Sequence, residues 1–195
     1  MKKPDWQGRT IICVASGPSL TAKDCELVHA SALEHGYPVI VINTTFRLCP
    51  WADVLFAFDA KWWRTYHEEV KRVFEGRLLT FSPVAAQYGA ESLNRCKWFG
   101  NFGNSGACAV GLAIAGGADK VILLGYDCQV NGKTHWHGDH PAGMSNVASI
   151  RHWPAQFKSL ALDAGRDGVQ VINASRETAL KCFERRALEE VLNRH

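Results

Sequence analysis

Six short apolar runs divide the chain, and stretches with helical spacing of apolar residues separate most of them. The runs are rich in Val, Ile, Leu and Phe, with little regular alternation of polar residues. Such runs are typical of strands that are buried on both faces of a parallel sheet. They cover residues 9–15, 37–43, 52–58, 77–81, 120–125 and 169–172.

Helices are predicted between these strands. Thr21 followed by Asp24 has the spacing of a capping box, which places the start of the first helix. Leu27, Val28 and Leu33 are expected to form the buried face of this helix. The remaining helices are expected over residues 61–74, 107–115, 149–164 and 178–194, and a further short strand over residues 96–99.

The alternation of strands and helices predicts a three-layer, Rossmann-like α/β fold with a mainly parallel sheet, formed by residues 1–195 as a single domain. The adjacent Trp62 and Trp63 are interpreted as core packing rather than as a binding site. The composition, 47% hydrophobic and 21% charged, is that of an ordinary folded protein.

Bulk properties limit the functional classes. The sequence lacks a run of about 20 apolar residues and a signal-peptide pattern, so we expect a cytoplasmic protein without membrane association. Seven scattered cysteines without a C-x-x-C pair predict reduced thiols. The formal net charge of +3 does not require a nucleic-acid partner, although Arg185, Arg186 and Arg194 gather near the end of the chain. No pattern predicts an oligomeric state.

Polar and small residues follow the predicted strands, where a parallel α/β sheet binds its ligands. Gly17 permits close approach of the backbone in the loop of residues 16–19, and the following helix offers N–H donors to a phosphate. Residues 103–106 have the same relation to the next small-residue helix. Ordinary turns and helix caps explain these loops equally well. The candidate nucleotide-binding residues are Ser16, Gly17, Pro18, Ser19, Asn43, Asp59, Asn104, Ser105, Gly106 and Asp127.

The densest chemistry lies at His135, His137, Asp139 and His140, which fall within six residues. Imidazoles bind metals and titrate near neutral pH, so this cluster favours either a metal site or proton transfer. The letters resemble the H-x-H-x-D-H motif of metallo-β-lactamase-fold hydrolases, in which it binds two zinc ions. That motif lies early in longer chains, whereas only His152 and His195 follow here. A single metal held by some of these four residues remains an alternative.

The order of the motifs carries a second resemblance. Residues 16–20 read S-G-P-S-L after the first strand, Asn43 ends the second, Asp59 ends the third, N-S-G stands at 104–106, and V-I-L-L-G-Y-D-C at 121–128. This order resembles the bacterial sialyltransferases that use CMP-sialic acid. It is also similar to the broader superfamily of MptE-like 6-hydroxymethylpterin diphosphokinases and uncharacterised phage-encoded proteins. The resemblance covers about residues 9–183.

The resemblance implies a role for each matching position. Residues 16–19 would lie along the phosphates, Asn43, Ser105 and Gly106 would contact the nucleotide donor, and Asp127 would lie near its ribose or base. Gln129 and His135 match two tyrosines that hold the departing phosphate in the sialyltransferases. His137 or His140 would be the general base, within an active-site loop or flap at residues 128–148. Ser16 and Phe102 replace an Asn and an Arg of that family, so the implied donor is a CMP-sugar or a similar nucleotide.

We therefore expect a glycosyltransferase-like enzyme that uses a nucleotide-activated donor and an unknown acceptor, with a histidine base. Three alternatives stay open. An ATP-dependent diphosphokinase would need Mg²⁺, for which Asp59, Asp127 and Asp139 are the candidate carboxylates. A hydrolase would use a metal on the histidine cluster, and a phage protein could bind nucleotides or nucleic acid without catalysis.

Overall fold

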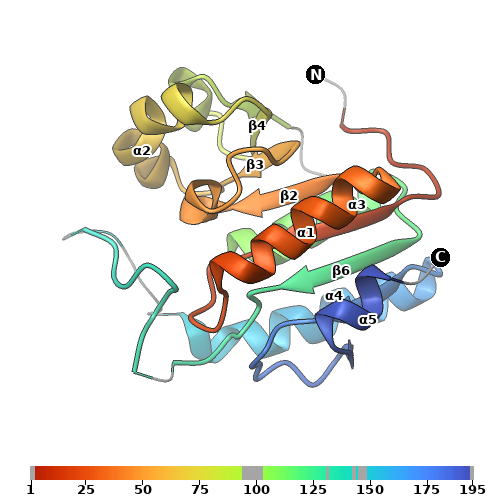
Figure 1. Cartoon of the computed structure of the whole chain (residues 1–195). Coiled ribbons are helices and arrows are strands. Elements are labelled where there is room, and N and C mark those ends of the chain that lie inside the picture. The colour runs from red at the N-terminus through yellow and green to blue at the C-terminus, as the bar shows by residue number, and fades with distance from the viewer. Residues whose placement is uncertain (1–2, 94–102, 131, 142–143, 145–148, 194–195) are drawn as a thin grey trace.

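A single parallel sheet of eight strands forms the centre of the protein, with helices on both of its faces (Figure 1). The computed structural model describes residues 3–93, 103–130, 132–141, 144 and 149–193. The strands are β1 (Thr10–Val14), β2 (Val39–Ile42), β3 (Val54–Phe56), β4 (Arg77–Thr80), β5 (Glu91–Ser92), β6 (Lys120–Leu124), β7 (Gln170–Asn173) and β8 (Glu184–Arg185). The predicted three-layer, Rossmann-like α/β fold is confirmed.

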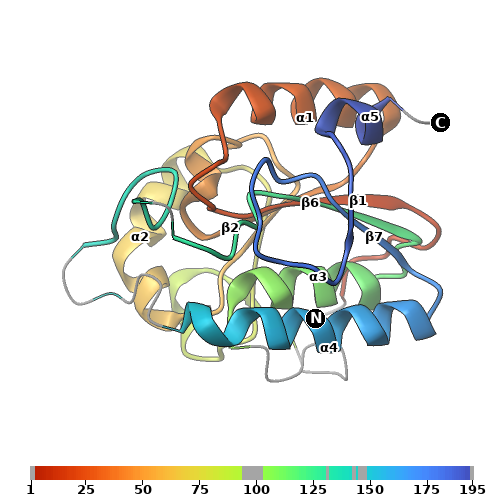
Figure 2. The ribbon, with the colours of Figure 1, turned by 90° about the horizontal axis from the view of Figure 1, so that it is seen from below.

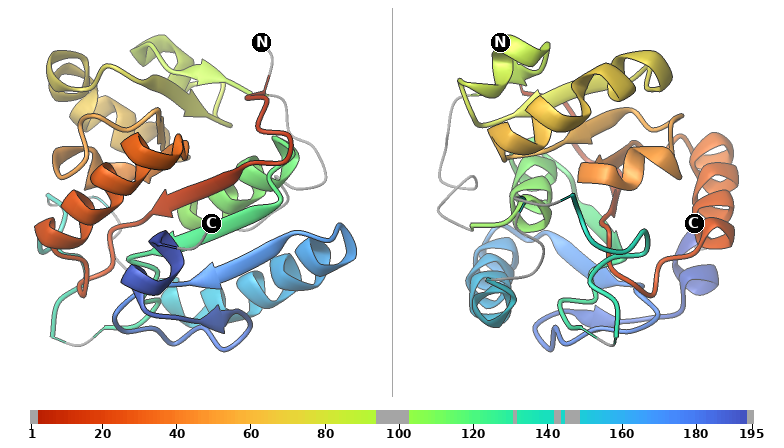
Figure 3. Two further views of the ribbon diagram at one scale, coloured as in Figure 1. Left: turned by 45° about the vertical axis from the view of Figure 1, so that its right-hand side comes forward. Right: turned by 90° about the vertical axis from the view of Figure 1, so that its left-hand side faces the viewer.

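The strand order is β5-β4-β3-β2-β1-β6-β7-β8, and every neighbouring pair is parallel. The arrows of β1, β6 and β7 accordingly point the same way (Figure 3). The chain builds the sheet outward from β1 as far as β5 and then returns to the other side of β1 with β6. This reversal between β1 and β6 is a topological switch point, where open α/β sheets form a crevice outside their carboxyl ends.

Five α-helices lie among the described residues: α1 (Ala22–His35), α2 (Ala60–Val73), α3 (Ser105–Ala115), α4 (Trp153–Arg166) and α5 (Leu188–Leu192). Three short 3-10 helices accompany them, η1 (Asn43–Arg47), η2 (Ala85–Tyr88) and η4 (Ile150–His152). Helices α1 and α5 cover one face of the sheet, and α3 and α4 cover the other (Figure 2). None of the described helices is long and apolar enough to cross a bilayer.

Strand β1 shows why unbroken apolar runs form the centre of this sheet. Ile11 and Cys13 belong to the core cluster beneath α3 and α4, whereas Ile12 and Val14 belong to the cluster beneath α1 and α2. All four side chains are fully buried. Successive residues of a strand point to opposite faces, so a strand with helices on both sides must be apolar at every position.

The predicted start of α1 and the predicted core packing of two tryptophans agree with the structure. Thr21 and Asp24 form the capping box of α1, with hydrogen bonds in both directions, and Gly36 ends that helix in a left-handed conformation. The side chains of Trp62 and Trp63 are buried in the core, as predicted. Cys13, Cys25, Cys49, Cys128 and Cys182 are free thiols.

Other predictions were wrong or shifted. Leu33 is 76% exposed, because α1 turns Cys25, Val28 and Ser31 toward the sheet and leaves Leu33 on the solvent side. The predicted helix over residues 149–164 is a 3-10 turn followed by α4. The strand expected at residues 96–99 lies outside the described residues.

The predicted C-terminal helix over residues 178–194 is also wrong. Its first part is irregular and leads into β8, and only Leu188–Leu192 is helical. The buried hydroxyl of Thr178 donates to the Tyr126 carbonyl (2.7 Å) and accepts a hydrogen bond from Asn173 Nδ2 (3.1 Å). These contacts with the ends of β6 and β7 outweigh the helical propensity of the segment.

Candidate functional site

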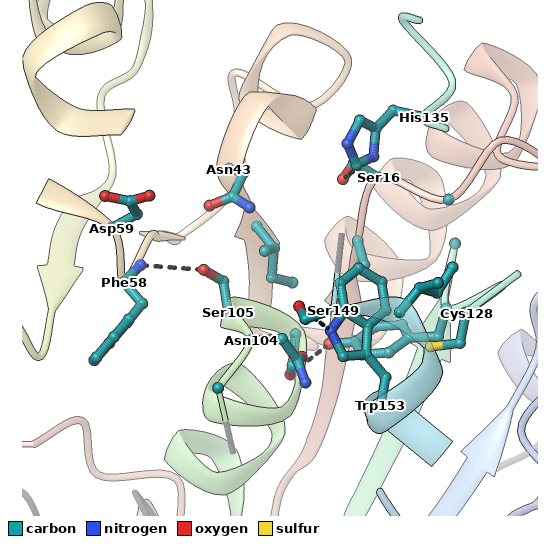
Figure 4. Close-up of a pocket in the computed structure, with 18 of the residues that line it drawn as sticks. Ser16, Asn43, Phe58, Asp59, Asn104, Ser105, Cys128, His135, Ser149 and Trp153 are labelled. Carbon is teal, nitrogen blue, oxygen red and sulfur yellow. Dashed lines mark hydrogen bonds between the residues drawn. The ribbon is translucent and has the colours of Figure 1, made fainter. Parts of the chain in front are cut away.

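A cavity of about 480 Å³ opens at the carboxyl ends of the strands, beside the switch point between β1 and β6. Its wall is formed by the loops after β1, β2, β3, β4 and β6 and by the start of α3 (Figure 4). Most of the residues that we predicted for the site lie in this wall. They are Ser16, Gly17, Pro18, Asn43, Asp59, Asn104, Ser105, Gly106, His135 and His140.

The loops after β1 and β6 touch each other through their backbones. Gly17 N donates to Gly125 O at 2.8 Å. A Cβ atom at Gly17 would lie 2.4 Å from Gly125 O and 2.2 Å from Asp127 Oδ1. Gly125 has a φ of +69°, and a Cβ there would lie 2.5 Å from Ala15 O. Both positions therefore require glycine, and the loop of residues 16–19 is held rigidly at the floor of the cavity.

Asp127 holds this loop in place through Ser19, and neither residue is among those that line the cavity. The Asp127 side chain is 1% exposed and accepts hydrogen bonds from Ser19 N (2.8 Å) and Ser19 Oγ (2.9 Å). Burial raises the pKa of Asp127, while the hydrogen bonds from Ser19 act in the opposite direction. Both oxygens of the carboxylate are thus occupied within the protein, which differs from the ribose or base contact that we expected.

Asn43 combines an unusual backbone conformation with an unsatisfied side chain. It has a φ of 51°, which is uncommon for a residue other than glycine. Its Oδ1 atom is buried and has no hydrogen-bond partner in the described part of the chain. Asn43 lines the cavity, so a flip of its side-chain amide would present the oxygen to a bound ligand.

Two other predicted residues act as helix caps at the rim of the cavity. Asp59 is the N-cap of α2 and accepts from Lys61 N at 2.7 Å. Asn104 caps α3 by accepting from Ala107 N at 2.8 Å, and its Nδ2 donates to Gln156 Oε1. Ser105 Oγ accepts from Phe58 N at 3.1 Å (Figure 4). The capping interpretation is therefore correct for Asp59 and Asn104, and the start of α3 also faces the cavity.

The histidine segment, residues 134–140, is attached to the loop after β1. Trp136 N donates to Ser16 O at 3.2 Å, and Ser16 Oγ lies 3.4 Å from His135 Nδ1. Figure 4 shows the ring of His135 beside Ser16 at the edge of the cavity. On the other side, His140 Nδ1 lies 3.3 Å from the hydroxyl of Tyr66 in α2. The segment thus bridges β1 and α2.

The three imidazoles of this segment lie together. Ring centroids are 5.1 Å apart for His135 and His137, 4.9 Å for His135 and His140, and 5.0 Å for His137 and His140. Burial and the proximity of His140 lower the pKa of His135 to about 4. Burial and the neighbouring imidazoles likewise lower the pKa of His137 to about 4. Burial and Arg47 lower the pKa of His140. The cluster is therefore neutral at pH 7.

The Asp139 carboxylate is hydrogen-bonded to Thr134 and not to these imidazoles in the described part of the chain. It is exposed, and its Oδ1 accepts a hydrogen bond from Thr134 Oγ1 at 2.5 Å. This arrangement does not resemble a dinuclear zinc site, in which the aspartate is a ligand. Within the described ranges, no set of three or more His, Cys, Asp or Glu side chains has its ligand atoms already placed to hold a metal ion.

The sequence analysis missed several aromatic residues of the site. Phe58, Phe81, Trp153 and Phe157 line the cavity together with the predicted polar residues. Phe81 directly follows β4 and Phe58 lies two residues after β3. The expectation that ligands bind outside the strand ends, which selected Asp59, could have selected both rings as well. Trp153 and Phe157 come from α4, and no local pattern indicates which face of a helix meets a cavity.

Comparison with known proteins adds no assignment. No protein-family model matches this chain, and no curated protein matches it.

Proposed function

We propose that this protein is a transferase that uses a nucleotide-activated donor, with a glycosyl group as the transferred part. The observation that carries the proposal is the cavity at the switch point, because it combines a glycine-containing loop, a helix start and aromatic rings. Its volume of about 480 Å³ lies within the usual range of small-molecule sites.

Each part of the wall suits one part of a nucleotide. The start of α3, at Ser105 and Gly106, lines the cavity, and the backbone N–H groups of a helix start favour a phosphate. The rings of Phe58, Phe81 and Trp153 offer apolar faces on which a base can stack. Asn43 Oδ1 is an acceptor without a partner among the described residues and can take a hydrogen bond from a hydroxyl or amino group.

The histidine segment supplies the candidate base. His140 lines the cavity, and its lowered pKa keeps the imidazole neutral at pH 7 and able to accept the proton of an acceptor hydroxyl. Gln129 and His135, which match the phosphate-holding tyrosines of the sialyltransferases, also line the cavity. These positions support group transfer from a nucleotide, but they do not identify the acceptor.

The other candidate functions have less support. A diphosphokinase would use carboxylates for Mg²⁺, yet Asp127 is occupied by Ser19 and Asp139 by Thr134, which leaves Asp59 in the cavity wall. A nucleic-acid surface would need free cations. Arg186 forms an ion pair with Glu184, and Arg185 donates to two backbone carbonyls. Arg194 lies outside the described residues.

Isothermal titration of the purified protein with CMP, UDP, GDP and ATP tests the proposal. We expect saturable binding of at least one nucleotide and at least a 10-fold loss of affinity in Asn43→Gly. Glycine tolerates the left-handed backbone at this position, so the variant removes the amide without adding strain. Leu33→Gln, on the solvent side of α1, is the matched control. Absence of binding to all four nucleotides by the folded protein would refute the proposal.

A further inference from the structure

Five buried side-chain polar atoms lack a hydrogen-bond partner in the described part of the chain, and they lie in only two segments. They are Asn43 Oδ1 and Thr45 Oγ1 of η1, and His135 Nε2, Trp136 Nε1 and His137 Nε2 of the histidine segment. A buried polar atom without a partner lowers the stability of the folded state by about 1–3 kcal/mol, so such atoms are rare in native proteins. Three of the five atoms belong to the histidine segment, which favours a polar or ionic ligand beside that segment.

The arrangement of the three imidazoles indicates what that group is. Their centroids form a nearly equilateral triangle with sides of 4.9, 5.0 and 5.1 Å. Three imidazoles around one tetrahedral zinc ion, with Zn–N distances of about 2.0–2.1 Å, have ring centroids about 5 Å apart. Packing alone does not require this triangle.

The outer ring nitrogens are also arranged as in metal sites. His135 Nδ1 lies 3.4 Å from Ser16 Oγ, and His140 Nδ1 lies 3.3 Å from the Tyr66 hydroxyl. Histidine ligands usually form such a contact through the nitrogen that does not bind the metal, which fixes the ring. The His135 side chain is 8% exposed, and its Nε2 is left without a protein partner, as is Nε2 of His137.

We propose that His135, His137 and His140 together bind one divalent transition-metal ion, with Zn²⁺ as the expected occupant. Neutral imidazole is a preferred zinc ligand, and three protein ligands leave a position for water or a substrate oxygen. The nitrogens do not converge in the present arrangement. Metal binding therefore requires the rings to turn about their Cβ–Cγ bonds, which moves the centroids little because each lies close to its rotation axis. The contacts of His135 Nδ1 with Ser16 and of His140 Nδ1 with Tyr66 would have to re-form in the bound state.

The lack of positively charged side chains in the cavity wall indicates a task for the metal, the neutralisation of phosphate charge. Among the described residues that line the cavity there is no lysine or arginine, and Asp59 adds a carboxylate. A phosphate-bearing donor therefore needs a cation, and His135 and His140 line the same cavity. A metal on the three imidazoles would neutralise charge on the departing phosphate, and a hydroxide formed from metal-bound water would accept the proton of the acceptor in place of His140. This task rests on the proposed function, whereas the metal site itself rests on the geometry alone.

The test of the site is a metal titration of the full chain, prepared without a polyhistidine tag and stripped with a chelator. We expect one equivalent of Zn²⁺ to bind, and Co²⁺ to give the visible absorption of a tetrahedral site. His137→Ala should lower the Zn²⁺ affinity more than about 100-fold, and Tyr66→Phe about 10-fold, because it removes only the contact that orients His140. His152→Ala, an exposed histidine, is the matched control and should bind Zn²⁺ normally.

Folding of each variant is checked by urea denaturation, and His137→Gln replaces His137→Ala if the latter does not fold. Wild-type protein without stoichiometric Zn²⁺ would overturn the proposal, as would folded His137 variants with undiminished affinity. Nucleotide titrations with and without Zn²⁺ then test the task separately. Bound zinc that leaves nucleotide affinity unchanged supports the site and overturns the assigned task, whereas zinc binding without any nucleotide binding refutes the proposed function alone.

Discussion

Replacing Gly17 by alanine is expected to destabilise the protein strongly, although the backbone at this position permits alanine. The new Cβ would lie 2.2 Å from Asp127 Oδ1, 2.6 Å from Asp127 Cγ and 2.4 Å from Gly125 O. Each distance is more than about 1 Å inside an ordinary contact. The loops after β1 and β6 would have to separate, since neither the carbonyl of Gly125 nor the buried carboxylate has free space.

The cost can be estimated from the contacts that must break. Overpacking alone costs about 1–3 kcal/mol. Displacing Asp127 also weakens two hydrogen bonds from Ser19, and a hydrogen bond to a charged group contributes about 1.5–3 kcal/mol. We therefore expect Gly17→Ala to lower the free energy of unfolding by about 3 kcal/mol or more, which for a chain of this size lowers the Tm by about 6–12 °C.

Urea denaturation followed by circular dichroism measures this change. Gly165→Ala in α4 is the matched control, because a Cβ there meets nothing within 4 Å, and the same substitution should stabilise the protein by about 0.5–1 kcal/mol. The variant Asp127→Ala should not rescue Gly17→Ala, since the clash with the Gly125 carbonyl remains. A loss below about 1 kcal/mol for Gly17→Ala would refute the close packing of the two loops.

Three further changes test the packing around the sheet. Burial alone would raise the pKa of Asp24, but hydrogen bonds from Arg176 and Thr21 outweigh it and lower the pKa below its ordinary value of 3.8. Asp24→Asn should therefore lower the free energy of unfolding by about 2 kcal/mol at pH 7. In urea denaturation, the difference from wild type should disappear as the pH falls from about 4 through the lowered pKa. An equal loss at pH 2 would contradict this. Trp63→Ala should lower the free energy of unfolding by about 3–5 kcal/mol, because the ring is fully buried and its Nε1 donates to Ala57 O at 2.9 Å. A well-folded variant with a nearly unchanged Tm would argue against this core. Leu33→Lys should change stability by less than about 0.5 kcal/mol, whereas a large loss would mean that the outer face of α1 is covered in solution.

The fold could be predicted because its signals are local. Unbroken apolar runs identify strands with helices on both faces. The capping box of Thr21 and Asp24, a motif of only four residues, marks the start of α1. The carboxyl ends of parallel strands meet at the same edge of a sheet, so the residues that follow the strands indicate part of the cavity wall without knowledge of the strand order. Ser16, Asn43 and Ser105 were found in this way.

The remaining features depend on contacts between distant residues. Nothing near Asp127 indicates that its carboxylate is occupied by Ser19, 108 residues earlier. The segment after β7 was predicted as helix because its buried contact with Tyr126 is invisible locally. The spacing of His135, His137 and His140 likewise does not show which nitrogens have partners, because Ser16 comes from the loop after β1 and Tyr66 from α2.

The strand order also has a consequence for synthesis of the chain on the ribosome. Strand β1 forms first, yet one of its two neighbours is β6, and Thr10 pairs with Lys120, 110 residues later. At about 5–20 residues per second, the open edge of β1 waits roughly 5–20 s for its partner. An unpaired, apolar central strand is a template for association with other chains. Nascent chains of this protein therefore need protection, by a chaperone or by slow release, at the stage when β2–β5 have emerged and β6 has not.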